Sequence, residues 1–237
     1  MTRELSIIFP IYNEEKTIKI TLNEWVEELK KLKINFEIIL AEDGSTDNTK
    51  TVLNSIIDND NENIFINNIK KERRGYATAL LESFEVCRGR YIFCSDADGQ
   101  CSPRDFYKFL NLIKKDTFDI VIGHRYPRKD NIYRIVMSKM FFILHKILFF
   151  SKISDPSCPY IIFKKEILPN ITGNIQQMTE GFWWGFIGSS IKNKLKISQI
   201  KISHKKRTIG TTNVFKLSKI PLIAYKNIVG LIRIKIF

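Results

Sequence analysis

The sequence predicts an α/β fold with a mostly parallel central sheet flanked by helices. Short apolar runs rich in β-branched and aromatic residues alternate with helix-like stretches along the chain. With 44% hydrophobic residues, a chain of 237 residues can bury one sizeable core. Polar clusters follow four of the apolar runs, as expected where ligands gather beyond the carboxyl ends of parallel strands.

The expected elements follow one another in the order strand, helix, strand. Five runs predict strands, at Leu5–Pro10, Phe36–Ala41, Asn63–Ile66, Tyr91–Ser95 and Asp119–Gly123. Apolar residues near helical spacing predict helices at Thr17–Lys33, Thr46–Ile57 and Gly75–Cys87. Because helices separate consecutive strands, the connections are crossovers, and the strands should run parallel.

The positive charge is concentrated near the end of the chain. The segment Gly181–Phe237 contains twelve Lys or Arg residues and no Asp or Glu, within a net charge of +13. Such a segment suits an anionic surface, either phospholipid headgroups, a lipid phosphate or nucleic acid. A general lysine bias of the composition is the alternative explanation, but the complete absence of acids favours an anionic partner.

The cysteines carry no metal or redox signature. Cys87, Cys94, Cys101 and Cys158 follow no zinc or redox spacing. No secretory signal precedes the first strand, so we expect reduced thiols and a cytoplasmic location.

Polar residues follow four of the expected strands. The clusters read PIYNEE from Pro10, AEDGSTDNT from Ala41, SDADGQ from Ser95 and GHRY from Gly123. Asn, Asp and Ser also form turns and helix caps, which is the expected role of Ser45, Thr46 and Asp47. Acids converging on one sheet edge would be costly without a ligand or a cation, and this favours function for Asp43 and Asp96.

Asp96, Asp98 and Gln100 form a candidate metal site. Two carboxylates and an amide oxygen make a half-shell of hard ligands, which suits Mg²⁺ or Mn²⁺ completed by substrate phosphates and water. An isolated Asp-x-Asp is more often a solvated turn, so its context decides. The chain has no Gly-x-x-x-x-Gly-Lys loop and no Gly-x-Gly-x-x-Gly after the first strand, which disfavours P-loop and dinucleotide-binding folds.

The ordered motifs resemble those of family 2 glycosyltransferases. The four clusters above are followed by DPSCPY from Asp155 and HKKRTIGTT from His204. Within that family the chain is most similar to enzymes that move a sugar from a nucleotide to polyprenyl phosphate, such as dolichyl-phosphate mannose synthases. The resemblance implies a glycosyltransferase-A fold, with a catalytic domain over residues 1–215 and a basic amphipathic segment over residues 216–237.

The resemblance also implies site residues. Asp96, Asp98 and Arg207 would be catalytic, and Asp96, Asp98 and Gln100 would hold Mg²⁺ or Mn²⁺. The donor, a GDP- or UDP-hexose, would be bound by Pro10, Tyr12, Glu14, Ala41, Asp43, Asp96, Ala97, Asp98, Gln100, Arg125 and Arg207. In this arrangement Tyr12 packs on the base, and the arginines neutralise phosphate oxygens with their planar guanidinium groups. The spacing of Arg207 to Gly210 and Thr212 supports its role.

The acceptor side is expected on Tyr133–Phe150. Helical geometry puts Arg134, Ser138 and His145 near one face. The resemblance implies that Arg134 and Ser138 bind the phosphate of a lipid-phosphate acceptor. The apolar remainder of this helix can pack on the core or lie in a lipid interface, and its apolar stretches are too short to span a bilayer. We therefore expect peripheral contact with the cytoplasmic membrane face.

The expected reaction is an inverting displacement at the anomeric carbon. A polyprenyl phosphate is already an anion and needs no general base, whereas a glycan hydroxyl acceptor would require one, and Glu180 is the candidate. Asp155 either approaches the sugar or caps a turn before Pro156. Two alternatives from other classes are a non-catalytic protein that binds an anionic surface and a nucleic-acid-binding protein. The chain contains no recognisable nucleic-acid module, so no nucleic-acid partner is expected.

Overall fold

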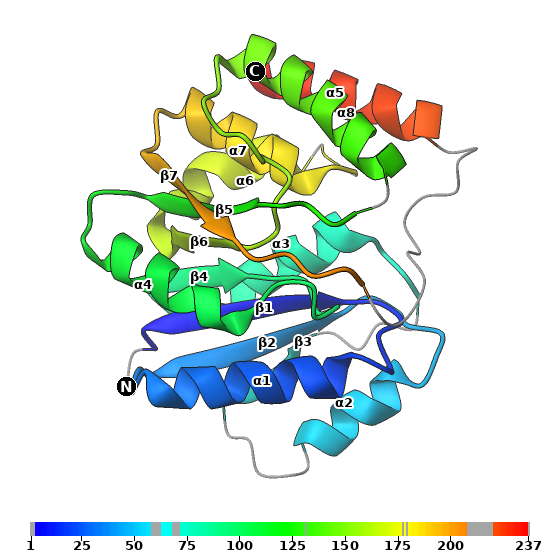
Figure 1. The fold of residues 1–237 in the computed structure, drawn as a ribbon, viewed down its shortest axis with the longest axis vertical. Coiled ribbons are helices and arrows are strands. Elements are labelled where there is room, and N and C mark those ends of the chain that lie inside the picture. The colour runs from blue at the N-terminus through cyan, green and yellow to red at the C-terminus, as the bar shows by residue number, and fades with distance from the viewer. Residues whose placement is uncertain are drawn as a thin grey trace.

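The computed structural model describes residues 3–57, 63–67, 72–130, 132–176, 178, 180–207 and 220–236. Within these residues a seven-stranded sheet has the order β3-β2-β1-β4-β6-β5-β7 (Figure 1). Its strands are β1 (Leu5–Ile11), β2 (Phe36–Glu42), β3 (Ile64–Asn67), β4 (Tyr91–Cys94), β5 (Ile120–Arg125), β6 (Ile161–Lys164) and β7 (Ile197–Ile202).

The sheet is parallel except for β6. Strands β1, β2, β3 and β4 pair in parallel, and so do β5 and β7, whereas β6 is antiparallel to both β4 and β5. The predicted mostly parallel sheet is therefore confirmed, and the five predicted strands begin and end within two residues of the observed ones. Since six of the strands share one direction, their carboxyl ends meet at the same edge of the sheet.

Helices cover both faces of the sheet (Figure 1). They are α1 (Ile18–Lys31), α2 (Thr49–Ile57), α3 (Tyr76–Val86), α4 (Phe106–Lys114), α5 (Ile132–Phe149), α6 (Leu168–Ile175), α7 (Phe182–Lys192) and α8 (Ile220–Ile236). Short 3-10 turns, Pro103–Asp105 and Lys165–Ile167, precede α4 and α6.

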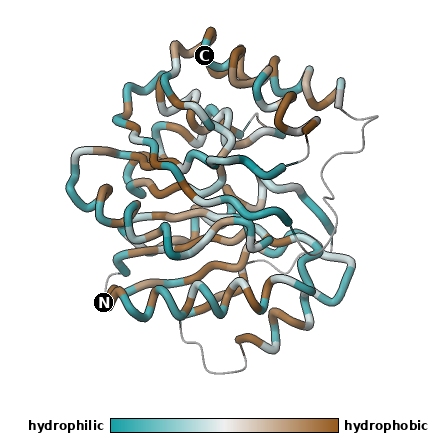
Figure 2. Tube along the Cα trace, in the orientation of Figure 1, coloured by the Kyte–Doolittle hydropathy of each residue, from teal (hydrophilic) through white to brown (hydrophobic). Residues whose placement is uncertain are grey.

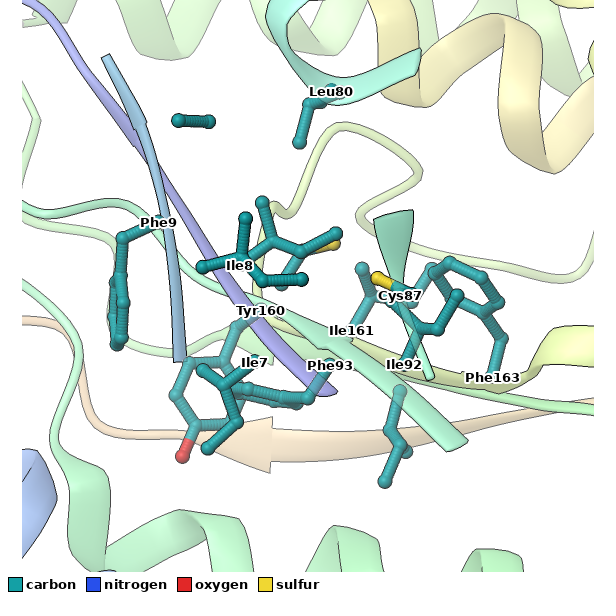
Figure 3. Packing of buried hydrophobic residues seen from close by; sticks show 14 of the residues in the cluster. Ile7, Ile8, Phe9, Leu80, Cys87, Ile92, Phe93, Tyr160, Ile161 and Phe163 are labelled. Carbon is teal, nitrogen blue, oxygen red and sulfur yellow. The ribbon is translucent and has the colours of Figure 1, made fainter. Parts of the chain in front are cut away.

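Aromatic contacts identify the two layers. On one face, Trp25 of α1 lies 5.2 Å from Phe93 of β4 and 5.7 Å from Phe106 of α4, measured between ring centroids. On the other face, Phe84 of α3 lies 5.5 Å from Phe163 of β6. Figure 3 shows part of this core, with strand residues such as Ile7, Ile92 and Phe163 beside Leu80 of α3. Burial of this apolar surface is the main stabilising term of the domain.

Helices α5 and α8 lie side by side at one end of the molecule, beyond α7 (Figure 1). Phe149, Trp184, Leu231 and Ile234 form a small separate core there with Met178. The basic C-terminal segment thus packs on the domain through one face of α8. Its predicted boundary at 215/216 lies outside the described residues.

Candidate active site

The loops after β1 and β2 are joined by side-chain hydrogen bonds. The Asn13 amide N–H donates to Ser45 Oγ over 3.0 Å, and the Thr46 amide N–H donates to Asn13 Oδ1 over 2.8 Å. The Glu14 amide N–H donates to Thr49 Oγ1 over 2.9 Å. Ser45 and Thr46 therefore shape the edge of the site, and Asp47 accepts the Thr49 amide N–H over 3.0 Å at the start of α2, in line with the expected role of these three residues in caps and turns.

Asp43, directly after β2, is hydrogen-bonded to the backbone at the start of α3. Its buried carboxylate accepts the amide N–H of Arg74 over 2.8 Å and that of Gly75 over 2.9 Å. Gly44 adopts φ +73°, and a Cβ there would lie 2.4 Å from the carbonyl carbon of Glu72. Only glycine permits this approach of the two loops. Asp43 thus lies at the predicted site, with its carboxylate bound to backbone amides.

Tyr12 lies beside Arg73 at the same edge. The Arg73 guanidinium carbon is 4.0 Å from the centroid of the Tyr12 ring, and its Nε is 3.6 Å from Asp43 Oδ2. One face of the ring expected to pack on a base thus carries a cation. Pro10 and Ala41 are neighbours in the β1–β2 pairing, which places these predicted donor residues together.

Asp96 lies in the bend after β4 and is supported from two helices. Tyr76, the first residue of α3, donates its hydroxyl to Asp96 Oδ1 over 3.3 Å. The indole Nε1–H of Trp183 in α7 donates to the Tyr76 oxygen over 2.8 Å. Burial, followed by the charge of Asp96, raises the pKa of Tyr76 well above its usual value. Neither contact has a sequence signal, because the partners are 20 and 107 residues apart.

Arg207 lies between Glu14 and Asp98. One of its terminal nitrogens donates to both Glu14 oxygens, over 2.7 and 2.8 Å, and the other lies 3.8 Å from Asp98 Oδ2. Asp98 Oδ1 accepts the Gln100 amide N–H over 3.0 Å. The structure therefore brings these four predicted site residues together and puts a cation beside the carboxylates. Gly210 and Thr212, which follow Arg207, lie outside the described residues.

Gln100 joins the carboxylate segment to the segment that carries Arg207. Its side-chain amide donates to the Lys205 carbonyl over 3.0 Å, and the Lys205 amide N–H donates to the Gln100 carbonyl over 2.8 Å. Next to this pair of hydrogen bonds, Cys101 and His204 form a single antiparallel β-bridge through their backbones. The Gln100 side chain is thus held by backbone, and its role as a metal ligand stays a prediction.

The protein groups suited to a metal here are Asp96 and Asp98. Their carboxylate oxygens are hard ligands of the kind that Mg²⁺ and Mn²⁺ prefer. Within the described part of the chain, no cluster of three or more His, Cys, Asp or Glu side chains could hold a metal ion. The donor atoms of Asp96 and Asp98 have the right chemistry for such an ion, and their role as its ligands, beside substrate phosphates and water, stays a prediction.

Arg125, at the end of β5, is paired with Asp155. Its Nε and a terminal nitrogen each donate to Asp155 over 2.8 Å, and the same terminal nitrogen donates to Ser157 Oγ over 2.8 Å. Both partners are buried. Although burial alone would raise it, hydrogen bonding and the charge of Arg125 lower the pKa of Asp155 to about 2. Asp155 therefore orients Arg125, and contact of this guanidinium with phosphate stays a prediction.

Ser138 of α5 is hydrogen-bonded to Arg128, a residue that the sequence analysis did not single out. Arg128 donates to Ser138 Oγ over 2.7 Å and to Asp130 Oδ2 over 2.5 Å. The Lys129 amide N–H donates to His204 Nδ1 over 3.3 Å. The backbone of Arg134 belongs to α5, but its side chain lies outside the described part of the structure. The acceptor role of Arg134 and Ser138 stays a prediction.

Comparison with a family model identifies the class of protein. Residues 6–172 match the model described as glycosyl transferase family 2. The chain therefore belongs to this family, and the family assignment suggested by the ordered motifs is confirmed.

Two curated relatives act on polyprenyl phosphates by name. The chain is 25% identical over 213 residues to dodecaprenyl-phosphate galacturonate synthase of Rhizobium johnstonii, covering 88% of this chain and 61% of the relative. It is 26% identical over 166 residues to undecaprenyl-phosphate 4-deoxy-4-formamido-L-arabinose transferase of Yersinia enterocolitica, covering 70% and 50%. The chain thus spans between half and three fifths of the length of these relatives.

Solved structures share the fold. Glucosyl-3-phosphoglycerate synthase from Mycobacterium tuberculosis, in complex with Mn²⁺, uridine diphosphate and glucosyl-3-phosphoglycerate, superposes with a TM-score of 0.71 at 17% identity. The match covers 98% of this chain and 80% of that one. The complex of that enzyme with uridine diphosphate gives 0.69 at 16% identity, with the same coverage. The predicted glycosyltransferase-A fold is confirmed.

Proposed function

We propose that this protein transfers a hexose from a nucleoside diphosphate sugar to a polyprenyl phosphate. The observation that carries the proposal is the contact of Arg207 with Glu14 and Asp98, beside Asp96, at the carboxyl edge of a family 2 glycosyltransferase sheet. The names of the two polyprenyl-phosphate relatives support the choice of acceptor.

The donor is proposed to lie across this edge, with its diphosphate toward Asp96 and Asp98. Mg²⁺ or Mn²⁺ held by these carboxylates would offset the charge that develops on the leaving nucleoside diphosphate. Arg207 supplies a cation at the same place, because its guanidinium already lies 3.8 Å from Asp98 Oδ2. Tyr12, Asp43, Pro10 and Ala41 would form the nucleoside side. Whether the nucleotide is UDP or GDP is for the binding experiment to decide.

The proposed reaction is a direct displacement that inverts the anomeric carbon. The acceptor phosphate attacks this carbon as the bond to the nucleoside diphosphate breaks. A phosphate oxygen is already negative, so this chain needs only to orient it and to keep Asp96 and Asp98 in place. Arg134 and Ser138 are the proposed acceptor contacts, with Arg128 holding Ser138 through its 2.7 Å hydrogen bond.

The proposed membrane contact is the face that α5 and α8 turn outward, which we call the α5–α8 surface. Large apolar side chains are exposed along it, and Figure 2 shows apolar stretches on both helices. They are Ile132, Val136, Met140, Ile143 and Ile147 of α5, and Leu222, Tyr225, Ile228, Ile232 and Ile236 of α8.

The charge of the two helices suits an anionic lipid surface. Lys139, Lys146, Lys226, Arg233 and Lys235 are exposed, and neither helix contains an acid. No helix among the described residues is long and apolar enough to cross a membrane. From the exposed apolar and basic side chains of these helices we propose peripheral binding to the cytoplasmic membrane face.

A transfer assay tests the acceptor. UDP- and GDP-hexoses would be offered with Mn²⁺ to vesicles containing undecaprenyl phosphate, and in parallel to vesicles containing the unphosphorylated polyprenol. The proposal expects sugar transfer to the phosphate alone. Transfer to a glycan hydroxyl, with none to the lipid phosphate, would contradict it and direct attention to Glu180 as a base.

A further inference from the structure

A chain of two hydrogen bonds runs from the core of α7 to the candidate site. The Trp183 side chain is buried, and its Nε1–H donates to the Tyr76 hydroxyl oxygen over 2.8 Å. An indole nitrogen can only donate, so the phenol oxygen must accept this bond. The phenol hydrogen is then directed away from Trp183 and toward Asp96 Oδ1, 3.3 Å from the phenol oxygen.

The Trp183 ring is held by packing, and Tyr76 is held by its place at the start of α3. The Trp183 ring packs edge-on against Phe182, at 5.1 Å and 87°, and against Phe186, at 5.4 Å and 62°. Tyr76 begins α3 directly after Gly75, whose amide is bound by Asp43. The α3 start is thus attached to the predicted nucleoside side through Asp43 and to the predicted metal side through Tyr76.

We propose that Tyr76 and Trp183 are positioning residues that orient the Asp96 carboxylate for the metal and the donor diphosphate. This inference rests on the proposed function, because it assigns Asp96 to that ligand. A hydrogen-bond donor that holds one carboxylate oxygen limits the orientations that the carboxylate can adopt. The ion then meets a carboxylate that is already oriented for binding. Trp183 acts one step further away, by fixing the direction of the phenol hydrogen.

The chemistry of the phenol is consistent with this role. A phenol carries its proton at neutral pH, because its usual pKa is about 10. It therefore serves as a permanent donor and does not compete with Asp96 as an anion.

The test compares two Tyr→Phe variants. Tyr76→Phe removes the hydroxyl that contacts Asp96 and keeps the ring. Tyr160→Phe is the control, because it removes the hydroxyl of a buried tyrosine that donates over 3.0 Å to the Ser102 carbonyl, away from Asp96. Calorimetry with Mn²⁺ and UDP, and with Mn²⁺ and GDP, gives the dissociation constants. Thermal unfolding without ligand gives the stability.

The two variants should lose similar stability but differ in ligand binding. Groups that orient a metal ligand typically contribute roughly 10- to 100-fold to metal affinity, so Tyr76→Phe should weaken Mn²⁺–nucleotide binding by about 10-fold. Tyr160→Phe should bind as the wild type does. Trp183→Phe, which removes the indole N–H, should weaken binding by a smaller factor. Unchanged affinity in both Tyr76→Phe and Trp183→Phe would overturn the proposal.

A measurement without ligand separates this inference from the proposed function. The indole N–H resonance of Trp183, assigned with Trp183→Phe, should shift in Tyr76→Phe and in Asp96→Ala but not in Asp98→Ala. If the wild type binds neither nucleotide, the proposed function fails, and this resonance still decides whether the three groups are coupled. If neither Tyr76→Phe nor Asp96→Ala shifts this resonance, the proposed coupling of the three groups is wrong.

Discussion

The carboxyl edge of the sheet and the α5–α8 surface are built in opposite ways. At the edge, charged side chains are paired at short range, such as Arg207 with Glu14 and Arg125 with Asp155. On the α5–α8 surface, large apolar side chains such as Ile132 and Ile147 are 64% and 65% exposed. Ligand binding at the sheet edge should depend on the positions of single atoms. Membrane contact at the α5–α8 surface should depend on the total exposed apolar area.

This difference implies different responses to mutation. A polar network in a partly buried site fails when one member is lost, because its partner keeps the cost of burial without the bond. A contact made by apolar area loses only the share of the side chain that is changed. The predictions that follow begin with the edge and end with the surface.

The largest effect is expected from Asp98→Asn. The substitution removes a ligand charge with little change in volume, so transfer should fall by at least about 100-fold while the fold is kept. Initial rates and circular dichroism measure the two effects. Asp116→Asn is the control, since Asp116 is exposed and pairs with Lys164 away from the site. Full transfer activity of Asp98→Asn would show that Asp98 is not a ligand of a metal that the reaction requires.

The buried pair predicts a large loss of stability for Asp155→Asn. Arg125 would stay buried without its carboxylate, and breaking such a pair costs about 3–5 kcal/mol. Urea unfolding measures this loss. Asp116→Asn again serves as the control, because exposed pairs contribute about 0–1 kcal/mol. If Asp155→Asn and Asp116→Asn lose similarly little unfolding free energy, the buried Arg125–Asp155 pair does not stabilise the fold as predicted.

A pH effect is expected from His145, which lies under the α5–α8 surface. Burial lowers the pKa of His145 to about 4, despite a contact with the Trp184 carbonyl. The unfolded chain, with a histidine pKa of about 6.5, then binds the proton first. Stability is therefore full above about pH 6.5 and falls as the pH drops toward 4, by about 3 kcal/mol for this residue.

His145→Leu should remove part of that pH dependence. The pKa of His204 is also lowered to about 4, chiefly by burial, so roughly half of the slope should remain in the variant. Unfolding free energies from pH 7 to 4 give the slope. An unchanged slope in His145→Leu would show that this histidine is not buried as a neutral group.

The smallest effect is expected on the α5–α8 surface. Ile147→Asp should weaken binding to anionic vesicles by about 10-fold, through lost apolar contact and added negative charge. Its unfolding temperature should hardly change, because the side chain is exposed. Val86→Asp, which changes an exposed apolar residue of α3, is the matched control in vesicle sedimentation. Equal binding by both variants and the wild type would exclude this surface as the membrane contact.

The sequence predicted the first half of the sheet well, together with the polar residues that lie at its carboxyl edge. Strands β1, β2 and β4 are mostly apolar runs, and the polar residues after them follow from the geometry of parallel strands. No bounds were predicted for β6, β7 or α7. The short β6 is antiparallel, and the helix signal of α7 is masked by apolar residues on all sides.

The contacts within the site could not be predicted, because they join distant parts of the chain. Arg207 meets Glu14 across 193 residues, and Trp183 meets Tyr76 across 107. The exposed face of α5 could not be predicted from the sequence either. Its apolar residues surround much of the helix, so only packing against α7 and α8 decides which of them are exposed.

The most direct test of the account is donor binding. Calorimetry would measure UDP, GDP and their hexose derivatives against the wild type and Asp98→Asn, each with and without Mn²⁺. The wild type should bind one nucleotide in a metal-dependent way, and Asp98→Asn should not. If folded wild-type protein binds none of these ligands, the account is contradicted, and the basic segment would point instead to a non-catalytic or nucleic-acid-binding protein.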